Sequence, residues 1–177
     1  MSGRESASQQ NELYETAVRQ FGRALDRLAA GYEANAEKRR DLRQEIHFRL
    51  WRSLSAFDGR CSLRTWTFRV AHNTAATWVD QERRSNQKFI TLEEIEPTLA
   101  GGEPEPDLDR PRALAQLTGM ILRLKPLDRQ IILSYLEDLD NSSIADITGL
   151  TAAHVAVKIH RIKAILSRRF AKDSSHA

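Results

Sequence analysis

The chain has 177 residues, of which 41% are hydrophobic and 29% charged, and its formal net charge is +3, so we expect one domain or two small ones. A single cysteine, Cys61, excludes an internal disulfide and a multi-cysteine zinc site, and it fits a reducing compartment. No apolar run approaches the roughly 20 residues of a membrane span, and the polar start is unlike a signal peptide, so a cytoplasmic protein without membrane insertion is expected.

The first half of the chain predicts three helices after a Ser/Gln-rich start, residues 1–10, that we expect to be frayed. Apolar residues recur every three or four positions in the first two stretches: Leu13, Ala17, Phe21, Leu25 and Leu28; and Leu42, Ile46, Leu50 and Leu54, beside Trp51. The third stretch carries Leu63, Trp66, Val70, Thr74, Thr77 and Trp78 at helical spacing. A tract with Gly59 and the cap-type Ser62 separates the last two stretches. Residues 12–88 are therefore predicted to form one helical domain.

Residues 89–109 differ sharply in composition from both flanks. They hold seven acidic residues, no basic residue, three prolines and two glycines. Such a composition is typical of a flexible linker, and we expect a domain boundary there.

Residues 110–172 predict a second helical domain, whose apolar stripes are Leu114, Leu117, Ile121 and Leu124; Leu127, Ile131, Ile132, Tyr135 and Leu136; and Val155, Ile159, Ile162 and Leu166. Ala145, Gly149 and Val155 have the spacing of a helix-turn-helix: a small residue at the crossing, a turn with positive φ and a buried anchor. Oxygens of residues 141–143 can cap the first of these helices and Thr151 the second. The predicted fold class is all-α, with two small helical domains joined by the acidic linker.

Two helices carry clusters of positive charge. From Thr151 to Lys172 there are six Lys or Arg and no acidic residue, and the helix with Trp66 and Trp78 is also basic. Nucleic-acid binding needs cations for phosphates, polar groups for base edges and aromatic faces for unstacked bases. Two basic helices on either side of an acidic tether predict two separate DNA contacts.

Several motifs together resemble a known family. The stretches Asp41–Trp51, Phe57–Gly59, Arg64–Trp66 and Arg69–Asn73 resemble region 2 of bacterial RNA polymerase sigma factors of the extracytoplasmic-function (ECF) type. The residues that resemble region 4 of that family are Leu124–Arg129, Ile144, Ala145, Gly149, Val155 and Ile159–Arg161. The resemblance implies a sigma factor that binds core RNA polymerase, recognises a two-part promoter and helps to melt it.

The resemblance also assigns roles to residues. It implies a polymerase-docking set of Asp41, Gln44, Glu45 and Trp51, and a flipped minus-ten base held by Phe57, the loop 58–62 and Asn73. With the neighbouring cations and polar groups, the predicted minus-ten set is Phe57, Asp58, Gly59, Arg60, Ser62, Arg64, Arg69, His72, Asn73, Trp78, Gln81, Arg83 and Arg84. The predicted minus-thirty-five set is Thr151, Ala153, His154, Val157, Lys158, His160, Arg161 and Lys163.

The recognition helix departs from the family pattern, which commonly reads Thr-Val-Lys-Ser-Arg where this chain has His154-Val-Ala-Val-Lys158. Alanine and valine cannot make bidentate hydrogen bonds to bases, so we expect phosphate-driven binding with weak base discrimination at the upstream element. By the same analogy, an anti-sigma factor is an expected partner. The acidic linker is either a solvated tether or a segment threaded toward the polymerase active-site channel.

Other interpretations are simpler for individual residues. The three tryptophans at helical spacing are expected to be core residues first, with Trp78 the best candidate for a DNA contact. Cys61 is expected to be inert, because nothing nearby supplies a triad or a metal partner. The histidines have no metal-binding spacing, so no metal, cofactor or small-molecule substrate is expected.

Two other functions compete with the sigma interpretation. A stand-alone helix-turn-helix regulator with an N-terminal dimerisation or sensing module would footprint a palindromic site by itself, whereas a sigma factor would need core polymerase. A small metal-dependent enzyme would need clustered carboxylates in fixed geometry, and the dense carboxylates lie in the linker. We therefore expect a binding protein and not an enzyme.

Overall fold

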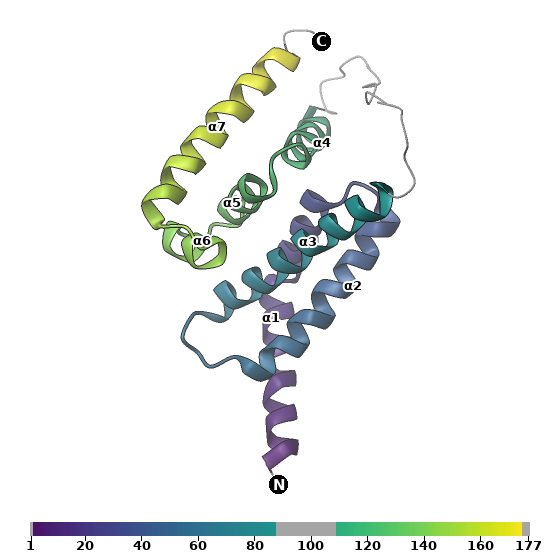
Figure 1. The fold of residues 1–177 in the computed structure, drawn as a ribbon, viewed down its shortest axis with the longest axis vertical. Coiled ribbons are helices and arrows are strands. Elements are labelled where there is room, and N and C mark those ends of the chain that lie inside the picture. Colours follow the sequence, from purple (N-terminus) through teal and green to yellow (C-terminus); the bar gives the residue numbers. More distant parts are fainter. Residues whose placement is uncertain (1, 88–108, 175–177) are drawn as a thin grey trace.

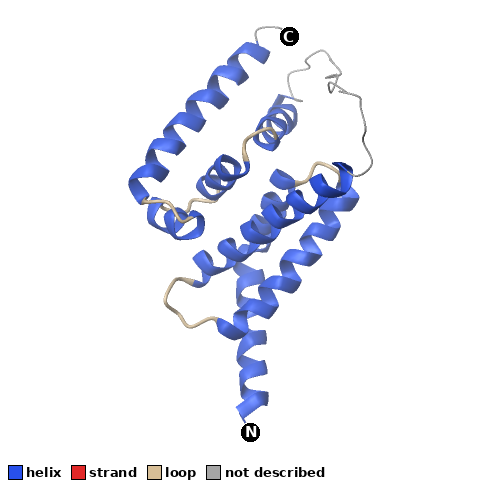
Figure 2. Ribbon diagram, viewed as in Figure 1, coloured by secondary structure: helices blue, strands red, loops and turns tan. Residues whose placement is uncertain are grey.

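The computed structural model describes the backbone of residues 2–87 and 109–174 and the side chains of residues 7–82 and 111–168. The regular structure in these ranges is helical and includes no strand, as predicted (Figure 2). In chain order the elements are α1 (Ser2–Tyr32), α2 (Ala36–Ser53), the short 3-10 helix η1 (Leu54–Ala56), α3 (Leu63–Gln87), α4 (Asp109–Leu122), α5 (Pro126–Leu136), α6 (Asn141–Thr148) and α7 (Ala152–Ser174).

The structure describes the start of α1 and the end of the predicted linker. Helix α1 begins at Ser2, so the prediction of a frayed start is wrong for residues 2–10. That stretch has no proline, and it continues the hydrogen-bond ladder of a helix whose later turns are packed, which favours helix propagation. Of the predicted linker, residues 89–108 lie outside the described residues, and Asp109 is the first residue of α4.

Helices α1, α2 and α3 pack on one another to form the first half of the molecule (Figure 1). The predicted stripes supply its core, with Leu25, Leu42, Ile46 and Leu50 almost completely buried. Helix α2 begins after Asn35, whose side chain accepts hydrogen bonds from the amides of residues 37 and 38. The amphipathic pattern of the sequence therefore dictates this bundle.

Helices α4 to α7 form the second half, in which α7 lies across α5 and α6. Asp140 caps α6, because its carboxylate accepts from the Ser143 amide at 2.6 Å, a bond that lowers the pKa of Asp140. The prediction that residues 141–143 supply this cap is therefore wrong by one residue. Thr151 caps α7 as predicted, through its hydroxyl and the His154 amide.

The apolar stripe of α5 is also displaced from its prediction. Tyr135 and Leu136 are exposed, and the buried residues of α5 include Leu133 and Ser134 instead. Leu114 of α4 is likewise exposed. The reason is that α5 contacts α7 on one side and helices α1 and α3 on the other, so a single stripe does not describe it.

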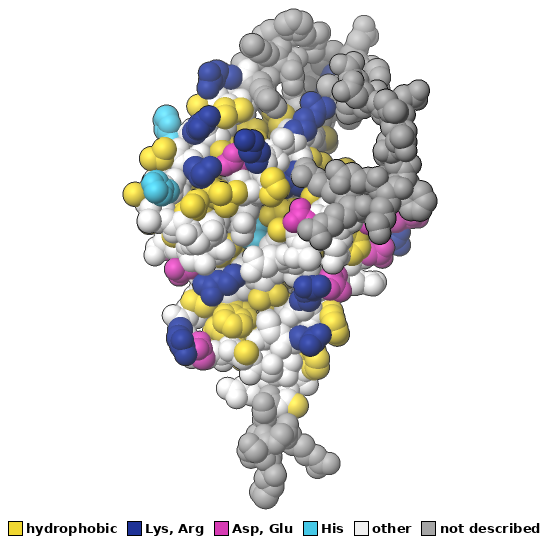
Figure 3. Space-filling view, viewed as in Figure 1, with side chains coloured by type: hydrophobic (Ala, Val, Ile, Leu, Met, Phe, Trp, Pro, Cys, Tyr) yellow, Lys and Arg dark blue, Asp and Glu magenta, His cyan; other side chains and the backbone are white. Residues whose placement is uncertain are grey.

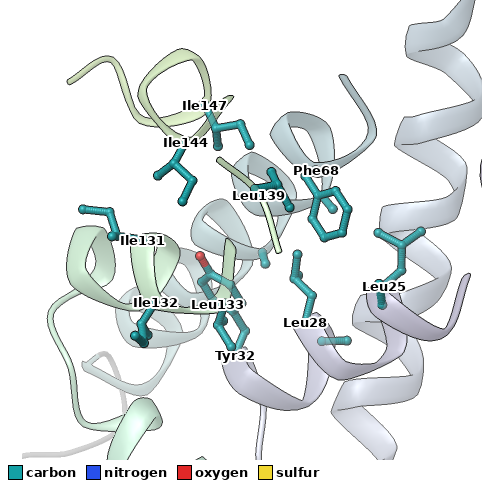
Figure 4. Packing of buried hydrophobic residues seen from close by; sticks show 14 of the residues in the cluster. Leu25, Leu28, Tyr32, Phe68, Ile131, Ile132, Leu133, Leu139, Ile144 and Ile147 are labelled. Carbon is teal, nitrogen blue, oxygen red and sulfur yellow. The ribbon is translucent and has the colours of Figure 1, made fainter. Parts of the chain in front are cut away.

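The two halves are not held apart but share one hydrophobic cluster. Figure 4 shows Leu28 and Tyr32 of α1 close to Leu133 of α5, and Phe68 of α3 close to Leu139, within one cluster. Helix α6 packs directly on α3. The two predicted helical domains therefore pack on each other as one closed body in this structure.

Candidate polymerase and promoter interfaces

The turn between α6 and α7 has helix-turn-helix geometry. Gly149 has a φ of 75°, in the left-handed region, and its amide donates to the Ala145 carbonyl at 2.8 Å. Val155 is fully buried below the turn, followed along α7 by the buried Ile159, Ile162 and Leu166. These positions are the ones that the sequence spacing predicted, and they fix which face of α7 remains outside.

The outer face of α7 carries most of the residues expected to contact the minus-thirty-five element. Seven of them are exposed: Thr151, Ala153, His154, Val157, His160, Arg161 and Lys163. Figure 3 shows basic and histidine side chains along the edge of the molecule that α7 forms. Val157 is 68% exposed, although it is apolar, which leaves it open to contact with thymine methyl groups.

Two cations of α7 have partners within the chain. The Lys158 ammonium forms an ion pair with the Asp128 carboxylate of α5 at 2.7 Å, and Lys158 is less exposed than Arg161 and Lys163. Lys163 lies 5.1 Å from the centre of the Tyr135 ring and donates to its hydroxyl at 3.2 Å. Arg161 is exposed on the same helix. The cations of this face are therefore not equally available to a DNA phosphate, because Lys158 and Lys163 contact Asp128 and Tyr135, whereas Arg161 is exposed.

The loop before α3 is held in a defined shape. Phe57 is half-buried and meets Trp66 edge to face, with ring centres 5.4 Å apart, while the Trp66 indole donates to Ser53. Asp58 accepts from the Arg60 amide and also pairs with its guanidinium at 2.8 Å. Gly59 has a φ of 76°, a conformation that favours glycine.

This loop ends in a cap for α3, where the Ser62 hydroxyl accepts from the Thr65 amide at 3.0 Å, as the sequence predicted. Local hydrogen bonds thus organise the loop 58–62 before any ligand arrives.

Helix α3 presents only part of the predicted minus-ten set. Asn73 and Gln81 are exposed, Arg69 is half-buried, and Trp78 is half-buried against the core. Arg64 is half-buried and donates to the Glu137 backbone carbonyl of the second half. The side chains of Arg83 and Arg84 lie outside the described residues.

His72 is a correction to the predicted DNA contacts. Its side chain is fully buried, with Nδ1 3.0 Å from the Tyr32 hydroxyl and Nε2 2.9 Å from the Ser134 hydroxyl. Burial lowers the pKa of His72 to about 3, so the ring is neutral at pH 7. In this arrangement His72 joins the two halves of the molecule and cannot reach a nucleic acid.

Charged groups also make contacts at the interface between the two halves, which we call the seam. The Glu137 carboxylate accepts two hydrogen bonds from the Arg27 guanidinium of α1, at 2.7 and 2.6 Å. The Arg129 guanidinium of α5 is buried and lies 5.5 Å from the centre of the Tyr32 ring. Gly31 of α1 lies so close to α5 that an added Cβ would come within 2.6 Å of a methyl carbon of Leu133.

The predicted polymerase-docking residues lie along one exposed strip of α2. Asp41 and Gln44 are exposed, Glu45 is half-buried and pairs with Arg49 at 2.5 Å, and Trp51 is 40% exposed. The prediction that Trp51 belongs first to the core is therefore wrong, whereas Trp66 and Trp78 do pack partly against it.

Phe48 belongs to this strip and was missed by the sequence analysis. It is 53% exposed and has the Arg52 guanidinium over its ring. Its position could have revealed it, because residues 41, 44, 48 and 51 follow one another at spacings of three and four on a single helix face. We define the α2 docking face as Asp41, Gln44, Phe48 and Trp51.

Other classes of site find no support among the described residues. No three His, Cys, Asp or Glu side chains gather there in a way that could hold a metal ion. In the same ranges, no helix combines the length and the hydropathy that crossing a membrane requires.

Comparisons with known proteins identify the two halves. The family model of Sigma-70 region 2 matches residues 17–85, and that of Sigma-70 region 4 matches residues 114–166. RNA polymerase sigma factor YlaC of Bacillus subtilis (strain 168) is 27% identical over 138 residues, which cover 77% of this chain and 80% of YlaC. ECF RNA polymerase sigma factor SigG of Mycobacterium tuberculosis (strain ATCC 25618 / H37Rv) is 32% identical over 83 residues, 47% of this chain and 22% of SigG.

The fold is also that of a solved sigma factor. RpoE from Bartonella quintana, in a co-crystal structure with the anti-sigma factor NepR, superposes with a TM-score of 0.68 and 17% identity, covering 90% of this chain and 96% of that one. The two matched regions occur in the predicted order and together span most of the chain. The chain therefore belongs to the sigma-70 family, as an ECF-type sigma factor with region 2 in its first half and region 4 in its second.

Proposed function

We propose that this sigma factor directs transcription initiation through three contacts, one with core RNA polymerase and two with promoter DNA. The α2 docking face supplies the first, because exposed aromatic side chains flanked by polar groups are typical anchors of protein interfaces. The shaped loop 58–62 with Phe57 and Asn73 supplies the minus-ten contact, and the outer face of α7 supplies the minus-thirty-five contact.

The minus-ten contact would drive melting by binding energy alone. An aromatic face can stack an extruded base, while loop amides and the Asn73 amide bond to its edge. Trapping the base offsets an unstacking cost of a few kcal/mol. The protein would act as a binding factor without catalysis of its own.

The minus-thirty-five contact would depend chiefly on phosphates. The exposed part of α7 offers Arg161 and the histidines, together with small apolar side chains that do not form bidentate bonds to bases. Weak base discrimination at this element follows, and specificity would come mainly from the minus-ten loop.

Partners and compartment follow from this role. The protein would work in the cytoplasm, where bacterial polymerase transcribes, and an anti-sigma factor would control it, as NepR is found in complex with RpoE from Bartonella quintana.

The closed arrangement implies a rearrangement before promoter binding. The minus-ten and minus-thirty-five elements are centred about 25 base pairs apart, which is roughly 85 Å of B-DNA. Helix α6 packs on α3, and α7 itself is only about 35 Å long at 1.5 Å per residue. One closed molecule therefore cannot place α3 and α7 on both elements at once, and the halves must separate.

The observation that carries the proposal is the presence, in one chain, of an exposed docking face on α2 and a helix-turn-helix whose second helix has no acidic residue from Ala152 to Lys172. Run-off transcription with purified core polymerase on genomic fragments tests it. Transcripts that appear only when the protein is added support the proposal. Binding of a palindromic duplex by the protein alone, with no effect on polymerase, would support the stand-alone regulator instead.

A single substitution tests the assignment of the minus-ten contact. Asn73→Ala should impair open-complex formation, measured by permanganate reactivity of the promoter, while polymerase association stays intact, because Asn73 is exposed on α3 and is not part of the α2 docking face. Equal loss of both activities would show that Asn73 is structural.

A further inference from the structure

The N-terminal turns of α1 contact the α2 docking face, although they lie outside the region 2 match, which begins at residue 17. The indole Nε1 of Trp51 donates to the Asn11 side-chain oxygen at 2.8 Å, and the Gln10 side chain donates to the Trp51 backbone carbonyl at 2.7 Å. Figure 1 shows that α1 starts beyond the end of the bundle before it runs along the other helices. Two bonds thus join the N-terminal part of α1 to one residue of the docking face.

A second pair of residues fixes the register of α1 against α2. The Tyr14 hydroxyl lies 3.0 Å from His47 Nδ1, and the two rings meet edge to face with centres 6.1 Å apart. Asn11 lies one helical turn before Tyr14, and Trp51 lies one turn after His47. Helix α1 therefore runs along the edge of the docking face for at least one turn on each helix, in antiparallel register.

An exposed tryptophan makes a better anchor when its polar group is already satisfied. Trp51 is 40% exposed and Phe48 is 53% exposed, so both rings are open to a partner. If its N–H were free, the indole would sample several rotamers and would need an acceptor on the partner surface. Asn11 supplies that acceptor in advance, so less rotamer freedom is lost on binding.

We propose that Asn11 positions Trp51 for docking on core RNA polymerase, so that Asn11 supports the polymerase-binding surface from α1. This inference rests on the proposed function of the α2 docking face. Pre-ordering one large side chain changes a dissociation constant by roughly two- to tenfold. Asn11 is therefore a positioning residue, and Trp51 is the residue that touches the partner.

A double-mutant cycle on the full chain tests the proposal. The variants are Asn11→Ala, Trp51→Phe and the double variant, because Trp51→Phe keeps a ring but removes the N–H donor. The dissociation constant for core polymerase is measured by competition against the labelled wild-type protein. Asn11→Ala should weaken binding two- to tenfold, and adding it to Trp51→Phe should cause no further loss.

Two controls keep the outcomes distinct. Gln9→Ala removes another exposed polar side chain from the same part of α1 and should leave binding unchanged. The melting temperature of each variant should stay within a degree or two of the wild type, which a merely structural role of Asn11 would not allow. Additive losses in the cycle, or no loss in Asn11→Ala, would overturn the proposal.

Failure of the underlying function looks different. If Trp51→Ala leaves the affinity for polymerase unchanged, then α2 is not the docking face, and both proposals fall. If Trp51→Ala weakens binding while Asn11→Ala does not, only the role of Asn11 is wrong.

Discussion

His72 makes the stability of the molecule depend on pH. Burial lowers the pKa of His72 to about 3, from a usual value near 6.5, so between these values the unfolded chain binds a proton that the folded chain does not. Its contribution to stability is therefore complete above pH 6.5 and is lost as the pH falls toward 3. Each pH unit in this window costs up to about 1.4 kcal/mol.

Comparison of the wild type with His72→Gln isolates this effect. The free energy of unfolding from urea titration should fall by about 2 kcal/mol more in the wild type than in the variant between pH 7 and pH 5. Burial also lowers the pKa of His47, but His47 is present in both proteins and cancels in the comparison. Parallel pH profiles would show that His72 is accessible to protons in the folded state.

The misplacement of His72 shows what the sequence could not reveal at this scale. It stands beside Asn73 in a basic helix, which suggested a DNA contact, but its partner Ser134 is 62 residues away. The alternation of buried and exposed positions along α3 indicates that one face of the helix is covered. It does not indicate which part of the chain covers that face. Asn73, on a different face of the same turn, remains exposed as predicted.

Helix α7 shows how much periodicity predicts for a single element. The spacing of apolar residues predicted the buried stripe of α7. Thr151, as the cap, predicted where the helix begins. Spacing does not reveal which cations are already paired, because Asp128, the partner of Lys158, lies on another helix. The same limitation explains α5, whose burial on two sides depends on packing between regions far apart in the chain.

This difference between cations predicts unequal effects on DNA binding. Arg161→Ala should lower the slope of log affinity against log salt by about one unit in promoter binding by the reconstituted holoenzyme. Lys158→Ala should change the slope less, because the Asp128 carboxylate already neutralises much of that charge. Filter binding or fluorescence anisotropy from low to moderate salt measures both slopes. A larger change for Lys158→Ala would mean that its ion pair opens on DNA.

At the scale of the whole molecule, the packing of region 4 on region 2 makes part of region 2 inaccessible to ligands. His72 is buried beneath α5, and Arg64 is engaged with Glu137, so both are unavailable to DNA while the halves are together. A ligand that binds only the open form has its apparent affinity reduced by the fraction of open molecules. Interactions that hold the halves together should therefore weaken binding of the promoter by the holoenzyme.

Two glycines of α1 allow a matched test of this coupling. An alanine Cβ at Gly31 would press on the buried Leu133 of region 4, whereas at Gly22 it would make only an ordinary contact, 3.8 Å from Val18. Both substitutions raise helix propensity by up to about 1 kcal/mol, so they differ mainly in their effect on the seam. Gly22→Ala should stabilise the closed form slightly, and Gly31→Ala should destabilise it by about 1–3 kcal/mol through overpacking.

The result should be visible both in shape and in binding. Small-angle scattering should give a larger radius of gyration for Gly31→Ala than for Gly22→Ala. The affinity of the Gly31→Ala holoenzyme for promoter DNA should rise, because more of the population is already open and less binding energy is used for opening. If Gly31→Ala stays as compact as Gly22→Ala and its holoenzyme binds the promoter no better, the packing of region 4 on region 2 does not limit promoter binding.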